Sequence, residues 1–245
     1  MNLMPFLVIL LFSILFVYKN TYLEKIVIWY IPLKQILCLF IFPAIFILLI
    51  SFLIQNILQR GLVTNQLIPR LWLLVVLELF ILLTYGGIAI HTVTKTLADK
   101  YLRNLKTDLA TLNSYFHLIF SHNLIYIGSI GIITCVASLD LHHIPTISSS
   151  PIWLNIIQGI IVGLIIAISM LHYTQSRDKY SGRFDDLKIV LIFLLICIIF
   201  LFSLAYLLSV DIRKYQIFIL AISTLLFLGF SFLSLTLRKK FLKYK

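Results

Sequence analysis

The sequence predicts an all-α fold, a polytopic bundle of transmembrane helices, and both composition and patterning support this. Of its 245 residues, 61% are hydrophobic and 12% are charged, whereas a soluble domain carries about 25% charged residues. The mean hydropathy is +1.07. The apolar residues gather in long runs, and about 20 residues of helix cross a hydrocarbon core roughly 30 Å thick. Lipid is therefore the expected solvent for most of the chain.

Seven apolar runs are predicted to cross the bilayer, and they leave room for only one integral membrane domain, residues 1–245. In order the runs cover about 3–18, 36–58, 67–90, 115–139, 152–173, 187–210 and 216–237. The first run has the length of a signal-peptide core, but no positive charge precedes it and no small-residue cleavage site follows it. We therefore expect an uncleaved first span. Because that run is short, a bundle of six spans is the alternative.

Lysine and arginine are distributed unevenly between the predicted loops, and this sets the expected orientation. Loops that hold few of them alternate with four basic segments, 19–35, 91–113, 174–186 and 238–245. With seven spans all four fall on one side, so the positive-inside rule places the N-terminus outside and the C-terminus in the cytoplasm. The net charge of +11 then reflects topology and anionic headgroups. We expect the lipid bilayer of a plasma or inner membrane as a partner, and no nucleic acid.

Glu78 is the first candidate for a functional residue, because it lies inside the third predicted span among apolar neighbours. A carboxylate at the centre of a membrane helix costs about 2.5–3.5 kcal/mol on insertion scales. Such an acid is either a proton or substrate site or a hydrogen-bonding link between helices. His122 in the fourth span is its expected partner, because the depths of the two residues differ by roughly 6 Å at 1.5 Å per residue.

The other histidines form two groups near the ends of predicted spans. One group is expected near the cytoplasmic ends and contains His91, His117 and His172. Histidines on different helices at similar depth are able to ligate haem or a metal ion. The second group lies in an outer loop and consists of His142 and His143. Together with Asp140, these side chains are able to ligate a divalent cation. Nothing in the spacing requires either ligand, so the cofactor is left unknown.

An amphipathic cytoplasmic helix is predicted between the third and fourth spans, over about 95–114. Its apolar seam repeats at alternating steps of three and four residues and includes Leu102, Leu105, Leu109 and Leu112. Such a seam is typical of a helix that lies on the membrane surface or docks a partner protein. Its order favours a docking helix for a cytoplasmic protein or another subunit.

Small residues in the fifth predicted span indicate a close contact between helices. Gly159 and Gly163 are four residues apart, and this spacing lets a neighbouring helix approach its backbone closely. We expect the contact to be internal to the bundle rather than a dimer interface.

The motifs of common membrane enzymes are missing from the sequence, which leaves catalytic residues unassigned and favours a non-enzymatic function. There is neither an HExxH pair nor a P-loop, and Gly128-Ser-Ile-Gly131 does not match a nucleophile elbow. The sequence favours a permease, a channel-type subunit, or an accessory subunit that works with other membrane or cytoplasmic proteins. A seven-span sensor that signals to a cytoplasmic partner is the alternative, favoured by the outside N-terminus.

Overall fold

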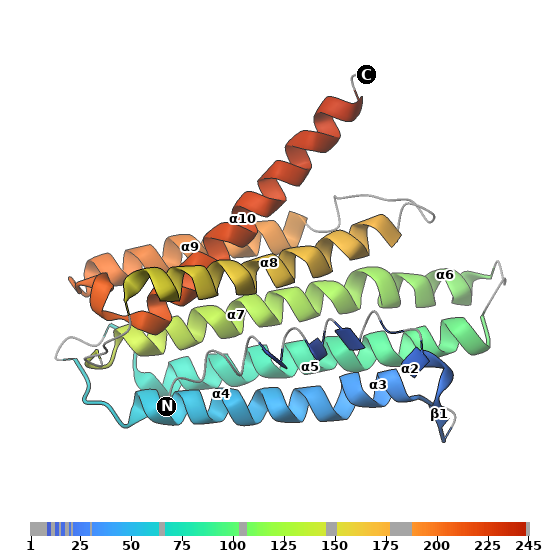
Figure 1. Cartoon of the computed structure of the whole chain (residues 1–245), viewed down its shortest axis with the longest axis horizontal. Coiled ribbons are helices and arrows are strands. Elements are labelled where there is room, and N and C mark those ends of the chain that lie inside the picture. The colour runs from blue at the N-terminus through green and yellow to red at the C-terminus, as the bar shows by residue number, and fades with distance from the viewer. Residues whose placement is uncertain are drawn as a thin grey trace. The chain divides into compact units, whose positions relative to one another are not determined.

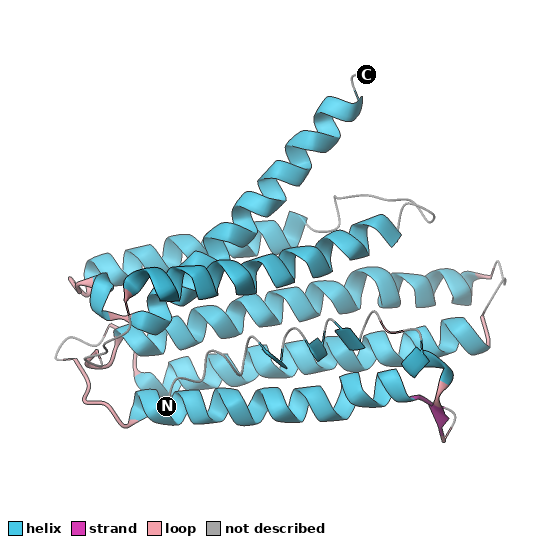
Figure 2. Cartoon of the chain, in the orientation of Figure 1, coloured by secondary structure: helices cyan, strands magenta, loops and turns pink. Residues whose placement is uncertain are grey.

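The protein is almost entirely helical in its computed structural model (Figure 2). The structure describes residues 9–10, 13–14, 16–17, 20, 22–29, 31–63, 67–102, 107–145, 151–176 and 188–243. Its elements in chain order (Figure 1) are α2 (Tyr22–Lys25), β1 (Val27–Ile28), β2 (Ile31–Pro32), α3 (Leu33–Ile36), η1 (Leu37–Ile41), α4 (Phe42–Leu58), α5 (Arg70–Lys100), α6 (Asp108–Tyr115), η2 (Phe116–Phe120), α7 (Ser121–Leu141), α8 (Ile152–Ser176), α9 (Lys188–Leu207), η4 (Ile212–Lys214) and α10 (Gln216–Lys243). The segments η1 and η2 are π-helical, and η4 is a 3-10 helix.

Six helical stretches are long and apolar enough to cross a membrane, among the residues that the structure describes. They are Leu33–Leu58, Arg70–Ala98, Asp108–Leu141, Ile152–Ser169, Lys188–Leu207 and Gln216–Ser234. Each overlaps one of the predicted runs from 36–58 onward, with bounds that differ by up to eight residues, so helix is confirmed for all six. The predicted first span, 3–18, lies largely outside the described residues.

The chain forms two compact units according to its internal contacts. Unit 1 comprises residues 1–51 and 79–129, and unit 2 comprises residues 52–78 and 130–245. Each unit is therefore built from segments that are distant in the sequence. The two units are described separately below.

Unit 1 begins with short elements that lead into its long helices. Strands β1 and β2 pair antiparallel, Val27 with Pro32 and Ile28 with Ile31. The reversal between them is tight, and Trp29 adopts a positive φ of 50° there, as two-residue hairpin turns require. Directly after Pro32 the backbone becomes helical, and α3, η1 and α4 continue without a break.

Within unit 1, α5 and α7 are antiparallel and their backbones approach closely at two glycines. A Cβ atom on Gly87 would lie 2.8 Å from the Ser121 carbonyl oxygen, and a Cβ on Gly128 would lie 2.8 Å from the Phe80 carbonyl oxygen. Real side chains do not tolerate such contacts with backbone, so only glycine permits this approach. The two glycines therefore determine the register in which α5 packs against α7.

The predicted amphipathic helix over 95–114 is wrong as a single element. The first part of that range is the end of α5, which extends to Lys100, and the last part is α6, which begins at Asp108. Thr107 ends the continuity because it adopts an extended backbone conformation and its side chain accepts a hydrogen bond from the Ala110 N–H at 3.2 Å. A threonine N-cap followed by an acidic residue is a strong start signal, which the seam of leucines obscured.

In unit 2, α8 packs along α10 through Gly159 and Gly163. A Cβ on Gly159 would lie 2.5 Å from the Leu220 carbonyl oxygen, and a Cβ on Gly163 would lie 2.9 Å from the Thr224 carbonyl oxygen. The Thr224 hydroxyl donates to the Gly159 carbonyl at 3.0 Å. The glycine pair thus serves a contact inside the chain, and α10 also contacts α9.

This close contact predicts unequal effects of the same substitution at two glycines. Gly159→Ala should lower the thermal unfolding midpoint in detergent, with a loss of about 1–3 kcal/mol from overpacking against the α10 backbone. Gly86→Ala is the matched control, because nothing lies within 4 Å of a Cβ at that position. Equal midpoints for the two variants would contradict the α8–α10 contact.

Candidate functional site

Three histidines from two helices of unit 1 form a cluster, and we call His91, His117 and His122 the histidine cluster. The ring centroids of His91 and His117 are 4.4 Å apart, with their planes inclined by 32°. Those of His91 and His122 are 4.7 Å apart at 86°. His91 is thus in ring contact with both other imidazoles, which come from the helix that runs antiparallel to its own.

The π-helical segment η2 brings two of these histidines to one side of their helix. The Ser121 N–H donates to the Phe116 carbonyl, five residues earlier. Residues five apart point in different directions on an α-helix of 3.6 residues per turn, whereas a wider π turn brings them closer in direction. His122 Nδ1 accordingly lies 3.0 Å from the His117 carbonyl oxygen, and the Ser121 hydroxyl donates to the same oxygen at 2.6 Å.

Polar side chains extend the histidine cluster at both ends. The ring of Tyr126 lies 6.2 Å from that of His122, one turn further along α7. On the other side, Thr94 Oγ1 lies 3.4 Å from His117 Nδ1. The buried Asn113 side chain donates to the Thr94 carbonyl at 2.9 Å and so holds α6 against α5 at this level. The cluster therefore belongs to a longer row of groups that donate and accept hydrogen bonds.

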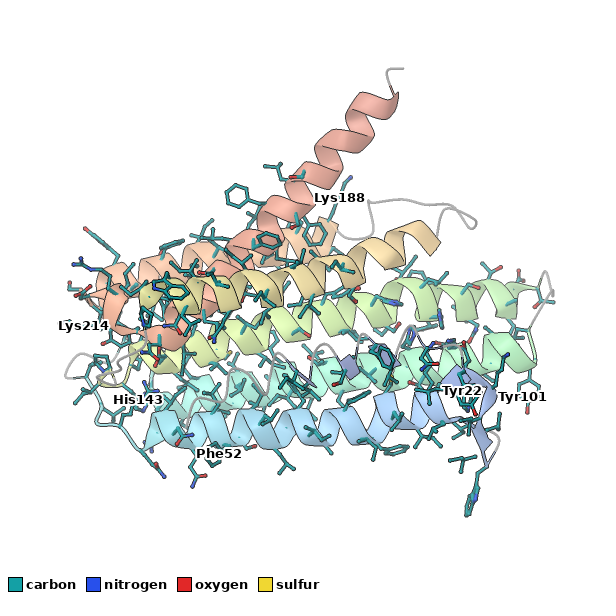
Figure 3. The ribbon with its side chains drawn as sticks, viewed as in Figure 1. Tyr22, Phe52, Tyr101, His143, Lys188 and Lys214 are labelled. Atoms are coloured by element: carbon teal, nitrogen blue, oxygen red, sulfur yellow. The ribbon has the colours of Figure 1, made fainter. Side chains whose placement is uncertain are left out.

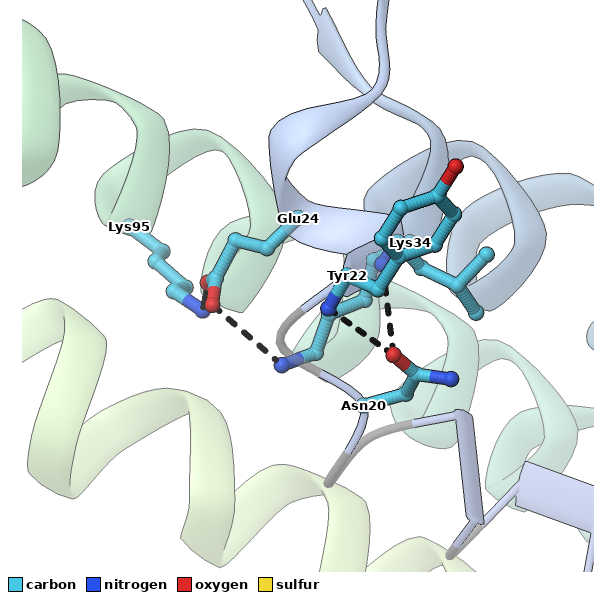
Figure 4. Close-up of polar contacts among 6 residues, drawn as sticks. Asn20, Tyr22, Glu24, Lys34 and Lys95 are labelled. Atoms are coloured by element: carbon cyan, nitrogen blue, oxygen red, sulfur yellow. Dashed lines mark hydrogen bonds and ion pairs between the residues drawn. The ribbon is translucent and has the colours of Figure 1, made fainter.

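Next to this row, α5 is tied to the N-terminal elements by the two residues that follow Thr94. Lys95 Nζ donates to Glu24 Oε1 at 2.5 Å, and the Thr96 hydroxyl donates to Gln35 Oε1 at 2.6 Å. Lys34 Nζ lies 3.8 Å from the other oxygen of Glu24, as Figure 4 shows for the two lysines and the carboxylate. The hydrogen bond from Lys95 lowers the pKa of Glu24 below its ordinary value, and the charge of Lys34 adds to this effect.

The geometry of the histidine cluster differs from that of a metal site. A metal ion bound by imidazole nitrogens lies about 2.0–2.1 Å from each of them, whereas the rings of His91 and His117 are tilted against each other at close range. In the described part of the chain, no group of three or more His, Cys, Asp and Glu residues is arranged to hold a metal ion. His172 lies in α8, and its side chain is outside the described residues.

The structure corrects the expected pairing of Glu78 with His122. His122 lies against His91 instead, and thirteen residues of α5, roughly 20 Å along the helix axis, separate His91 from Glu78. The side chain of Glu78 is exposed. The depth estimate failed because α5 continues to Lys100 and the following helix begins at Asp108, so the register of the two helices is not set by the ends of their apolar runs.

In unit 2, a second polar site joins the ends of three helices, and we call Arg60, Asp140 and Phe218 the Asp140 clamp. The Asp140 side chain is 1% exposed, and its Oδ1 lies 2.6 Å from Arg60 Nη1. Its Oδ2 accepts the backbone N–H of Phe218 at 3.1 Å, in the first turn of α10. The first N–H groups of a helix lack partners within the helix and carry partial positive charge, so a buried carboxylate is stabilised there.

The two adjacent histidines of the predicted outer loop have structural hydrogen bonds in this site. His142 Nδ1 donates to the Ser138 carbonyl at 2.7 Å, and its Nε2 lies 3.4 Å from the Ile68 N–H. His143 Nδ1 donates to the Leu139 carbonyl at 2.7 Å, and Figure 3 labels this residue near the end of α7. Burial lowers the pKa of His143.

Backbone hydrogen bonds complete this end of unit 2. The Val63 N–H donates to the His142 carbonyl at 3.1 Å, and the Ile144 N–H donates to the Gly61 carbonyl at 2.7 Å. Asp140, His142 and His143 thus hold helix ends together through hydrogen bonds, and they are not gathered around a common point in the way a cation requires. The sequence did not lead us to predict a role for Arg60. The available signal was that Arg60 and Asp140 have opposite charges and follow predicted spans that end on the same side of the membrane.

The leucines of the predicted docking seam have different positions. Leu109 and Leu112 are exposed on α6, Leu102 lies in a bend after α5, and Leu105 is outside the described residues. Exposure on α6 leaves these two leucines accessible to a partner. Docking at this surface stays a prediction.

Comparison with known proteins identifies no relative that explains either site. No family model matches the chain, and neither a curated protein nor a solved structure matches it significantly. The function is therefore inferred from the geometry of the sites.

The Asp140 clamp predicts a large loss of stability when its carboxylate is removed. Asp140→Ala should destabilise the protein by about 3–5 kcal/mol, because Arg60 is left with an uncompensated, largely buried charge. The loss should appear as a lower thermal unfolding midpoint in detergent. Asp211→Ala is the control, since Asp211 pairs with an exposed arginine, Arg213, and exposed pairs contribute little. A clamp variant as stable as this control would contradict the assignment.

Proposed function

We propose that this chain is a permease-type subunit of a membrane complex, and that its histidine cluster passes protons within the helix bundle. One observation supports this proposal above the others. Three imidazoles from α5, η2 and α7 are in ring contact inside helical stretches that are long and apolar enough to cross a bilayer. Ionisable residues inside such helices mark proton relays and ion pathways in membrane proteins.

Imidazole is the side chain best suited to this chemistry. Its ordinary pKa of about 6.5 lies near physiological pH, and its two nitrogens allow one ring to accept a proton while it donates another. Successive groups in the row are able to accept a proton from one neighbour and donate one to the next. In order, the row consists of Tyr126, His122, His91, His117 and Thr94. Charged imidazoles at these separations repel each other, so the histidine cluster is expected to titrate as a unit.

A purely structural role explains the histidine cluster less well. Other polar residues of α5 satisfy their hydroxyl groups within their own helix. Thr84 donates to the Phe80 carbonyl at 2.8 Å, and Thr92 donates to the Ile88 carbonyl at 2.9 Å. Packing two helices together requires only such small residues and glycine, so three facing imidazoles exceed the needs of packing.

The contact between Glu24 and Lys95 supports exchange of protons with water at one end of the row. Lys95 directly follows Thr94, which lies beside His117, and Glu24 is partly exposed. With the orientation expected from the basic loops, this end faces the cytoplasm. Protons would enter or leave the row there.

Proton flux into reconstituted vesicles tests the proposal. Vesicles that contain the purified chain and a trapped pH-sensitive dye should acidify under an imposed pH gradient faster than empty vesicles. His117→Gln should lower this conductance by about tenfold or more, because it interrupts the relay between His91 and Thr94.

His143→Gln is the matched control, because it makes the same chemical change in unit 2, outside the predicted spans. Its conductance should equal that of the unchanged chain once both proteins are verified as folded. Equal conductance in His117→Gln and the unchanged chain would contradict a proton relay. In that case the sensor predicted as the alternative would gain support.

A further inference from the structure

A short hairpin of unit 1 exposes an apolar tip directly before the stretch Leu33–Leu58. It is formed by β1, β2 and the turn residue Trp29, and we call it the Trp29 hairpin. Trp29 is 90% exposed, and the valine and two isoleucines of the strands are exposed as well. Figure 1 shows the hairpin, labelled β1, extending away from the start of α3. Its apolar side chains therefore contact the surroundings of unit 1 and not its core.

The backbone of Trp29 lies in a region that bulky side chains disfavour. Its φ is 50°, in the left-handed region where glycine and asparagine are the favoured residues of two-residue hairpin turns. Strained residues of this kind persist where other contacts hold them, and they gather at functional positions. Because the ring is 90% exposed, few of its contacts come from the described part of the chain. A contact outside the chain is therefore expected to hold it.

The length of the following helix indicates the depth of the hairpin. The stretch Leu33–Leu58 begins immediately after Pro32 and has 26 residues. It is thus about 39 Å long at 1.5 Å per residue, whereas the hydrocarbon core is about 30 Å thick. When this stretch crosses a bilayer, its first residues extend beyond the hydrocarbon into the layer of headgroups. The hairpin continues from that end, so it belongs to the same layer.

The chemistry of the hairpin fits this layer better than water or hydrocarbon. Exposed large apolar side chains are unfavourable in water, in proportion to their area. The open edges of a two-stranded hairpin are unfavourable among lipid tails, because their backbone groups find no hydrogen-bonding partner there. The headgroup layer accepts both, since it offers water and polar groups beside the first methylenes of the tails. Tryptophan is enriched at this level in membrane proteins.

Basic side chains predominate at the base of the hairpin. Lys25 ends α2, directly before the hairpin, and is exposed. Lys34 and Lys95 lie 3.8 Å and 2.5 Å from the two carboxylate oxygens of Glu24, as Figure 4 shows. Three lysines and one glutamate give these four residues a net charge of +2. An anionic group next to the hairpin complements this charge.

We propose that the Trp29 hairpin is an interfacial anchor that binds anionic phospholipid. The ring of Trp29 lies at the level of the lipid ester groups, and Lys25 contacts the phosphate. The negative surface potential of a leaflet attracts basic residues close to it, so an anionic lipid is favoured over a zwitterionic one. A stable protein partner needs about 800 Å² of surface on each side, more than the few exposed side chains of the hairpin provide. This anchor is independent of the proton relay.

Tryptophan fluorescence in nanodiscs tests the depth of Trp29. The chain has three tryptophans, so Trp72→Phe combined with Trp153→Phe leaves Trp29 as the only one. Its emission should be shifted to the blue relative to tryptophan in water, and aqueous iodide should quench it weakly. Lipids with bromine near the headgroup end of their tails should quench it more strongly than lipids with bromine near the methyl end.

The headgroup preference is tested in the same chain with Lys25→Gln. In phosphatidylcholine nanodiscs, brominated phosphatidylglycerol should quench Trp29 at a lower mole fraction than brominated phosphatidylcholine does. Lys25→Gln should raise the mole fraction of phosphatidylglycerol needed for half-maximal quenching by about fivefold, the effect of one lysine near an anionic surface. Lys214→Gln is the matched control, because Lys214 is an exposed lysine of unit 2, and it should leave this value unchanged.

Four results would overturn the proposal. Strong quenching by iodide with none by brominated lipid would place Trp29 in water, and stronger quenching from the methyl end would place it in the hydrocarbon. Protection from both quenchers would show that protein covers the hairpin. Equal quenching by the two headgroups, or equal effects of Lys25→Gln and Lys214→Gln, would remove the anionic lipid as ligand. None of these results depends on proton conductance.

Discussion

The close antiparallel contact of α5 with α7 in unit 1 is the constraint on which the histidine cluster depends. Gly87 and Gly128 allow the two backbones to approach, and this approach fixes the register between the helices. The register brings His91 level with His117 and His122. A larger residue at either glycine would separate the helices and with them the imidazoles. The position of the polar site is thus a consequence of the packing between these two helices.

In lipid, polar groups are favoured when they find partners within the protein, and many side chains of this chain do so in one of two ways. Hydroxyl side chains along the helices mostly bond to the carbonyl four residues earlier, as Ser138 does to Thr134 at 2.8 Å. Such bonds satisfy the hydroxyl groups within their own helix, without a partner on another element. At the helix ends, in contrast, side chains bond across elements, as Asp140 does to Arg60 and the start of α10. The Asp140 clamp therefore joins three helix ends in unit 2, whereas the histidine cluster places three imidazoles in ring contact between helices of unit 1.

Hydropathy alone predicted the six described helices that are long and apolar enough to cross a membrane, because length and apolar composition can be read from the sequence without knowledge of tertiary structure. The four-residue spacing of Gly159 and Gly163 predicted an internal contact, and in the structure both glycines face α10. The register between α5 and α7 could not be predicted from hydropathy or residue spacing. The prediction that paired Glu78 with His122 measured depth from the ends of apolar runs, but α5 extends well past its run. The π-helical segment η2 could not be predicted either, because no residue type is specific to a π-helix. In a regular α-helix, His117 and His122 would point in different directions. The histidines near span ends were recognised as a group, but their contacts were not.

The central claim is that the histidine cluster exchanges protons as one coupled unit, and nitrogen NMR of the protein in lipid, labelled with ¹⁵N only at histidine, tests it most directly. The titration of each ring is followed in the unchanged chain and in His91→Gln. The account predicts that this substitution changes the titration midpoints of both His117 and His122, since His91 is in ring contact with each, and leaves that of His143 unaffected. Unchanged midpoints for His117 and His122 would contradict it.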